Sequence, residues 1–209
     1  MSRAFQDLFG VLDPLRGLPM AGRTDLSIVT EVAALHGVPW DATALGRFRD
    51  AYLGHLANEI EQPGPRKGVM PGVGRLLDAL AVRDDAYLAL LTGNFEGGAR
   101  LKLEYFDLWR YFRCGAFGGD APERNGLLAK ALERVAACGG PSVGPSDVVV
   151  IGDTPLDVAV ATSAGARSVA VATGGHDADT LRSSGADVVF DDLSDTGAVL
   201  AALNLRSAI

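Results

Sequence analysis

The chain has 209 residues, of which 48% are hydrophobic and 22% are charged, a composition that is typical of an ordinary globular protein. It excludes intrinsically disordered and collagen-like chains. The net charge of −7 argues against nucleic acid and membrane as partners, because such surfaces need clustered Lys and Arg, and it favours small solutes. No apolar run approaches the roughly 20 residues that cross a bilayer, and no signal-peptide pattern opens the chain, so we expect a cytoplasmic protein.

The N-terminal third carries helical periodicity without a buried strand. We expect helices at Ser2–Phe9, Asp25–His36 and Ala42–Glu61, with Asp41 as the N-cap of the third. The segment Gln62–Gly68 is rich in Pro and Gly, which favours a linker, and another helix should begin at Pro71 and end near Val82. The sequence therefore predicts a small helical domain over residues 1–68 and a second domain over residues 69–209.

From residue 86 onward, short apolar runs alternate with helical patterns, which predicts βαβ units and a parallel sheet. The expected strands are Ala86–Leu91, Cys114–Phe117, Val148–Ile151, Ser168–Ala172 and Val188–Phe190. The expected helices between and after them are Gly97–Phe112, Asn125–Ala137, Pro155–Ala164, Ala178–Ser184 and Thr196–Leu203. The predicted fold class is a three-layer, Rossmann-like α/β domain.

Ligands of parallel sheets bind beyond the carboxyl ends of the strands, so the residues after each strand are candidate site residues. Thr92-Gly93-Asn94 follows the first expected strand and offers a hydroxyl, a close backbone and a carboxamide just before a helix, where an anion is favoured. Taken by itself, the tripeptide is better explained as a plain turn with a capping residue. Alone, this segment is a weak indication of function.

Two carboxylates follow the third expected strand, in Gly152-Asp153-Thr154-Pro155-Leu156-Asp157. Acidic side chains on a strand-to-helix loop suit a hard cation such as Mg²⁺, although aspartate near a helix start is also favourable without a metal. Arg124 follows the second expected strand and could clamp a phosphate in the same crevice.

These three segments resemble the second, third and fourth motifs of the haloacid-dehalogenase-like (HAD-like) hydrolases. Leu90–Asn94 is similar to the phosphate-binding motif, Arg124 stands where the family has Lys or Arg, and Ile151–Asp157 is similar to the metal-binding motif. Residues 1–68 resemble the small helical cap of phosphoglycolate-phosphatase-like members. Within them Gly22–Asp25 is similar to a cap segment that faces the substrate, with a turn and helix N-cap as the alternative.

The resemblance implies a Mg²⁺-dependent phosphatase that acts on a small phosphorylated metabolite. It implies catalytic roles for Thr92, Arg124 and Asp153, and metal ligation by Asp153 and Asp157. The residues implied in phosphate or substrate binding are Thr92, Gly93, Asn94, Arg124, Arg23 and Thr24.

The family forms an aspartyl-phosphate on the first Asp of an Asp-x-Asp-Gly motif, which ends a central first strand. In the N-terminal region, ahead of Asp41, the aspartates are Asp7, Asp13 and Asp25, and none follows an apolar strand or stands two residues from another. We therefore expect the central strand to be absent from this sequence. A fold that had lost this strand would leave buried backbone groups unpaired at roughly 1–3 kcal/mol each, so we expect a misplaced start or a truncation rather than an evolved loss. The 209-residue chain is accordingly expected to lack turnover.

Three functions remain open from the sequence. The first is the phosphatase described above. The second is a non-catalytic protein that binds phosphate esters and has lost its nucleophile. The third is a related chemistry of the same family, such as dehalogenation or phosphomutase activity. The sequence leaves the oligomeric state and the substrate open.

Overall fold

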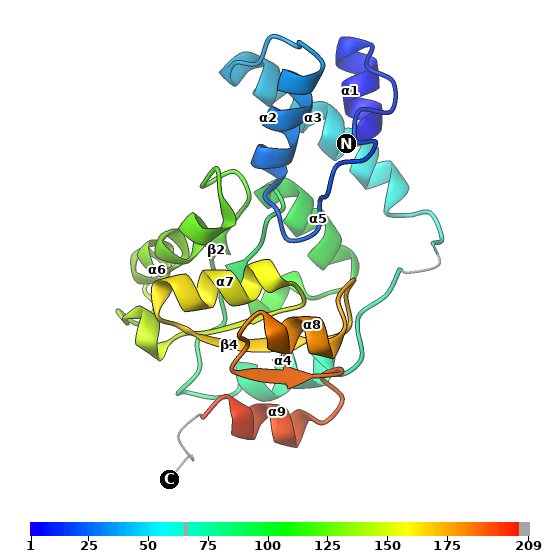
Figure 1. Ribbon diagram of the computed structural model, residues 1–209. Helices are drawn as coiled ribbons and strands as arrows, with labels where there is room; N and C mark the ends of the chain where they lie inside the picture. Colours follow the sequence, from blue (N-terminus) through cyan, green and yellow to red (C-terminus); the bar gives the residue numbers. More distant parts are fainter. Residues whose placement is uncertain (65–66, 205–209) are drawn as a thin grey trace.

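The computed structural model describes residues 1–64 and 67–204 (Figure 1). Residues 65 and 66 of the expected linker lie outside the described residues. Helices α1, α2 and α3 form the N-terminal part and gather on one side of the α/β part. Among the described residues, no helix is long and apolar enough to span a membrane.

The three N-terminal helices are α1 (Ser2–Phe9), α2 (Asp25–Leu35) and α3 (Ala42–Glu59). Their apolar faces pack on one another around Phe5, Val29 and Phe48, each of which is fully buried. Asp41 is the N-cap of α3, as expected, because its Oδ1 accepts a hydrogen bond of 2.8 Å from Ala44 N. The α/β part contributes Phe95 to this same core, so the two parts are packed together.

Within the described residues, the α/β part contains five strands, paired in parallel, and six α-helices. The strands are β1 (Leu90–Leu91), β2 (Gly115–Ala116), β3 (Val149–Gly152), β4 (Arg167–Val171) and β5 (Val188–Phe190). The α-helices are α4 (Val73–Ala81), α5 (Glu96–Tyr105), α6 (Leu127–Ala137), α7 (Pro155–Ala164), α8 (Ala178–Ser183) and α9 (Thr196–Ala202). The predicted α/β class with parallel strands is confirmed.

The strands form two separate sheets within the described residues. β1 is hydrogen-bonded to β2, and β3, β4 and β5 form a second sheet in that order. Val169 and Val171 of β4 pack against α4 and α9, whereas Ala170 between them packs against α7 and α8, so helices cover both faces. α6 spans the two sheets, since its Leu128 shares a core cluster with Leu91 of β1 and Val150 of β3.

One expected helix and two expected strands are markedly shorter than the sequence pattern suggested. The helix expected over Gly97–Phe112 ends at Tyr105, because Asp107 adopts a positive φ of 56° that no α-helix can continue through, and a 3₁₀ turn follows at Trp109–Tyr111. The strands expected over Ala86–Leu91 and Cys114–Phe117 are reduced to Leu90–Leu91 and Gly115–Ala116, because these two strands pair with each other over two residues each within the described residues.

Candidate active site

The start of α2 lies directly over the loops that follow β1 and β2. The N–H of Asp25 donates to Gly93 O at 2.6 Å, and the N–H of Leu26 donates to Gly118 O at 3.2 Å. The loops also bind each other, since Gly118 N donates to Asn94 O at 2.7 Å. These contacts hold the N-terminal helices against the carboxyl ends of the strands, and a cavity of about 710 Å³ lies between the two parts.

The cavity brings together residues that are far apart in the sequence. Thr92, Gly93 and Asn94 from the loop after β1 line it, and so do Arg124 and Asp153. The sequence predicted a role for each of these residues, and the structure places all of them around one space. The N-terminal part also lines the cavity, with Arg23, Asp25 and Tyr52 among its residues.

The loop after β1 lines the cavity and is held by hydrogen bonds within itself. Thr92 Oγ1 accepts two hydrogen bonds, from Asn94 N at 3.2 Å and from Asn94 Nδ2 at 2.9 Å. Gly93 lies so close to its neighbours that a Cβ there would overlap the Arg23 carbonyl oxygen and approach Arg124 Nη1 at 3.1 Å. A glycine is therefore needed where the N-terminal helices, the loop and Arg124 meet.

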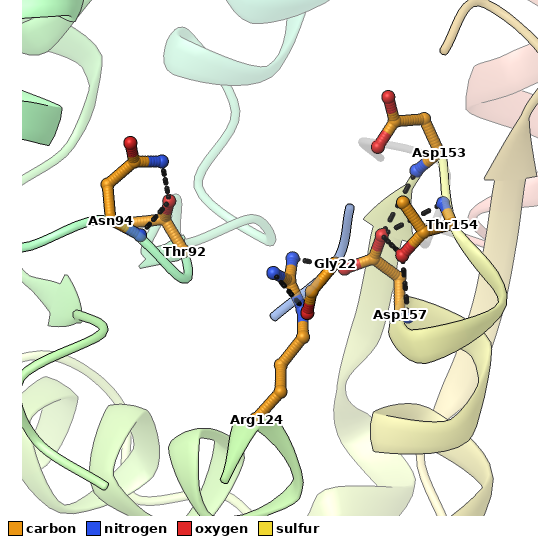
Figure 2. A network of polar contacts seen from close by, with 7 residues as sticks. All are labelled: Gly22, Thr92, Asn94, Arg124, Asp153, Thr154 and Asp157. Carbon is orange, nitrogen blue, oxygen red and sulfur yellow. Dashed lines mark hydrogen bonds and ion pairs between the residues drawn. The ribbon is translucent and has the colours of Figure 1, made fainter. Parts of the chain in front are cut away.

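The loop after β3 is built around a capping box. Thr154 is the N-cap of α7 and Pro155 takes the first helical position. Asp157 Oδ2 accepts from Asp153 N, Thr154 N and Thr154 Oγ1, at 3.2, 3.0 and 2.8 Å, and its Oδ1 forms an ion pair with Arg124 (Figure 2). The Asp157 side chain is 6% exposed, so its carboxylate is enclosed by protein donors.

Asp153 differs from Asp157 because it lines the cavity. Burial, and next the nearby carboxylate of Asp157, raises the pKa of Asp153 above its ordinary value. Figure 2 shows its carboxylate pointing away from the Asp157 network. A cationic ligand at this place would offset the unfavourable charge.

Arg124 reaches the cavity from a 3₁₀ turn, Arg124–Gly126, that precedes α6. Its Nη1 donates to Gly22 O at 3.1 Å, and its Nη2 pairs with Asp157. Its Nε is buried and has no hydrogen-bond partner among the described residues. A buried N–H donor without an acceptor costs roughly 1–3 kcal/mol, so a bound oxyanion within its reach would be stabilised.

Comparisons with known proteins agree with this geometry. Residues 123–196 match a family model described as HAD-hydrolase-like. A phosphoglycolate phosphatase of Rhodospirillum rubrum is 32% identical over 169 residues, which cover 75% of this chain and 66% of that protein. The chain belongs to the HAD-like hydrolases.

Two further relatives extend this result. A phosphoglycolate phosphatase of Chromobacterium violaceum is 30% identical over 149 residues, covering 71% of this chain and 60% of that protein. A crystal structure of a hydrolase from Pseudomonas syringae superposes with a TM-score of 0.63 at 18% identity, over 96% of this chain and 90% of that one, and shows the shared fold. The HAD-like chain thus matches about two thirds or less of the length of these two phosphoglycolate phosphatases.

Two residues of the expected site of this HAD-like chain lie outside the lining of the cavity. Thr24 is not a cavity residue: it is 1% exposed, its hydroxyl donates to Pro122 O at 2.9 Å, and it caps α2 by accepting from Ser27 N at 3.1 Å. Asp157 does not line the cavity either, because the capping box and Arg124 occupy both of its oxygens. Arg23 does line the cavity, but its guanidinium is paired with Glu31 at 2.6 Å.

Sequence reasoning missed a polar cluster at the cavity wall, formed by the buried Asp25 and the half-buried Asn94 and Lys102. Lys102 of α5 lines the cavity and donates to Asn94 Oδ1 at 2.5 Å, and Asp25 accepts from Phe95 N at 2.8 Å. Burial lowers the pKa of Lys102 and raises the pKa of Asp25. The available signal was a single Lys in the helix after the Thr92 loop, and nothing in that pattern tells which way its side chain points.

The residues present fit a divalent cation in part. Asp153 supplies one cavity-facing carboxylate of the hard oxygen type that Mg²⁺ prefers. No group of three or more His, Cys, Asp or Glu side chains that could hold a metal occurs in the described part of the chain. Further ligands would have to come from a substrate, from water or from an added acidic segment.

Proposed function

We propose that this HAD-like hydrolase is a phosphatase that acts on a small phosphorylated metabolite and uses Mg²⁺. The observation that carries the proposal is the convergence of Thr92, Arg124 and Asp153 on one cavity. A hydroxyl donor, a guanidinium and a carboxylate are the groups needed around a phosphoryl group and its cation. Because two relatives are named phosphoglycolate phosphatases, phosphoglycolate is the first substrate to test.

Each residue has a chemical role in this proposal. The Thr92 hydroxyl and the backbone after it would bind phosphoryl oxygens, and the unpaired Arg124 Nε would donate to the charge that develops during transfer. Asp153 would hold Mg²⁺, which when bound neutralises phosphoryl charge. Asp157 would orient Arg124 and the start of α7, because its oxygens are already occupied.

The nucleophile is proposed to come from a strand that pairs between β1 and β3. In the described residues β1 is bonded to β2 alone and β3 to β4 alone, which leaves one edge of each strand unpaired. Ile151 of β3 is 39% exposed, although parallel strands of such apolar sequence are normally covered. An apolar strand that ends in Asp-x-Asp-Gly would satisfy both edges and place its first aspartate beside Thr92 and Asp153.

The geometry at the N-terminus makes this proposal testable. Met1 lines the cavity, so an extension placed before it starts from the cavity wall. We would extend the chain with an apolar strand ending in Asp-x-Asp-Gly and a short turn, and measure hydrolysis of an aryl phosphate with Mg²⁺. The matched control carries asparagine in place of the first aspartate of that extension.

The phosphatase proposal expects turnover in the aspartate form and none in the asparagine form or in the 209-residue chain. Phosphoglycolate is then assayed in the active form by release of inorganic phosphate. A folded, extended chain that remains inert with Mg²⁺ on both substrates would contradict the phosphatase proposal.

One observation favours a second candidate, a non-catalytic protein that binds phosphate esters. The Thr92 loop and Arg124 are complete without any added strand, because their contacts lie within the described residues. This candidate predicts binding of a phosphate ester by the 209-residue chain and no hydrolysis by any extended form. Calorimetry with a non-reacting phosphonate analogue, together with the turnover assay, separates the two.

A further inference from the structure

The hydroxyl of Thr92 is oriented by the residue two positions later. A threonine hydroxyl has two acceptor lone pairs and one O–H donor. Here both acceptor positions are used, by Asn94 N at 3.2 Å and by Asn94 Nδ2 at 2.9 Å. The O–H of Thr92 must therefore point elsewhere, and Thr92 lines the cavity. A hydroxyl held in this way is prepared to donate to an oxyanion.

This arrangement depends on which end of the Asn94 carboxamide faces Thr92. If the amide were rotated by half a turn, Oδ1 would face the hydroxyl and accept its proton. The Thr92 O–H would then donate to Asn94 within the loop and could not donate to a ligand. One protein contact selects between the two orientations: Lys102 Nζ donates to Asn94 Oδ1 at 2.5 Å. An ammonium group has donors only, so it accepts just the observed orientation of the amide.

Lys102 is placed for this task by the helix that follows the loop. α5 begins at Glu96, immediately after Asn94 and Phe95, and carries Lys102 back to the cavity wall. Among the described residues its ammonium forms a hydrogen bond to Asn94 Oδ1 and no salt bridge within 4.0 Å. The ammonium is half-buried, and the Asp25 carboxylate attracts it without forming a salt bridge, so the hydrogen bond to Asn94 Oδ1 is the contact that fixes its position.

We propose that Lys102 is a positioning residue that acts through Asn94, holding the carboxamide so that the Thr92 hydroxyl remains a donor to the phosphoryl group. This inference rests on the proposed function, because it assigns Thr92 to an oxyanion. Lys102 is not a catalytic residue in this account, since its ammonium is engaged by Asn94 rather than directed at the reacting atoms.

A double-mutant cycle on orthophosphate binding tests the inference. We would measure orthophosphate affinity by calorimetry for the wild-type chain, Lys102→Met, Asn94→Ala and the double variant. Lys102→Met should weaken binding by about tenfold or more, the effect of losing one hydrogen bond to a charged group. If Lys102 acts through Asn94, adding Lys102→Met to Asn94→Ala should cause little further loss. An equal loss in both backgrounds would show direct action on the ligand and overturn the inference.

Two control variants separate positioning from simple charge. Lys102→Arg retains a cationic donor at the same place and should recover affinity to within about threefold of the wild type. Lys130→Met removes one positive charge from an exposed position of α6 and should leave the affinity unchanged. If Lys130→Met lost as much orthophosphate affinity as Lys102→Met, net charge alone would explain the effect, and the inference would be contradicted.

A second readout needs no ligand and keeps the two proposals distinguishable. In nuclear magnetic resonance spectra of the free chain, the Asn94 side-chain NH₂ protons should show contacts to Thr92. These contacts should be lost or averaged in Lys102→Met and retained in Lys102→Arg. Unchanged contacts in Lys102→Met would overturn the positioning role. Absence of orthophosphate binding by the wild-type chain would instead count against the proposed function.

Discussion

Arg124 and Asp157 form a buried ion pair, and replacing Arg124 by methionine should destabilise the fold markedly. Their side chains are only 14% and 6% exposed. Removing one partner of such a pair leaves an uncompensated charge, which costs about 3–5 kcal/mol. Three donors remain on Asp157 Oδ2, from Asp153 N, Thr154 N and Thr154 Oγ1, and they reduce this cost. We therefore expect Arg124→Met to lower the free energy of unfolding by about 2–4 kcal/mol.

The assay is urea unfolding at pH 7, followed by circular dichroism. Adding Asp157→Asn to the Arg124→Met chain removes the unpaired charge and should return part of the loss, about 1–2 kcal/mol. The control is Arg100→Met, which breaks an exposed pair with Glu104 and should cost no more than about 1 kcal/mol. The reasoning is refuted if Arg124→Met costs no more than the control, or if Asp157→Asn makes the double variant less stable still.

Two other predictions concern Asp153 and Asp25. A Cβ at Gly174 would overlap Asp153 Oδ2, so Gly174→Ala should displace this carboxylate and weaken Mg²⁺ binding about tenfold or more, as measured by calorimetry. The control is Gly175→Ala, which should leave the Mg²⁺ affinity unchanged because there is open space around a Cβ at that position. Equal Mg²⁺ affinities in the two variants would show that Asp153 is not a metal ligand. Because burial raises the pKa of Asp25, the folded state holds its proton more tightly than the unfolded chain does. The wild type should therefore lose stability relative to Asp25→Asn as pH rises from about 4 through that raised pKa. Melting temperatures from pH 4 to 7 check this, and a constant difference between the two proteins would contradict it.

The sequence predicted most accurately the elements whose ends are marked by capping residues close in the chain. The limits of α7 agree with expectation because Thr154, Pro155 and Asp157 start the helix and Gly165 ends it with a positive φ of 74°. Pairing between strands is not local, however, and the sequence pattern did not show that β1 and β2 pair over only two residues each. Likewise, the end of α5 depends on the left-handed Asp107, and the helical pattern continues past that residue.

The convergence of Thr92, Arg124 and Asp153 could be predicted because each follows a strand of a parallel sheet. Thr24 and Asp157 take part in helix caps in the structure. The sequence could not foresee this, because Thr and Asp serve equally well as caps and as ligands, and only the direction of the side chain separates the two uses. Lys102 could not be found from sequence, since its role depends on how α5 docks beside the Thr92 loop.

The central claim is that one cavity holds both the phosphoryl group and its cation. Crystals of the chain grown with Mg²⁺ and the phosphate analogue tungstate, measured at the tungsten absorption edge, test this claim directly. The account predicts an anomalous tungsten peak inside the cavity, within hydrogen-bond reach of Thr92 Oγ1 and Arg124 Nε. A tungsten peak only at other places on the protein, with the cavity filled by water alone, would contradict it.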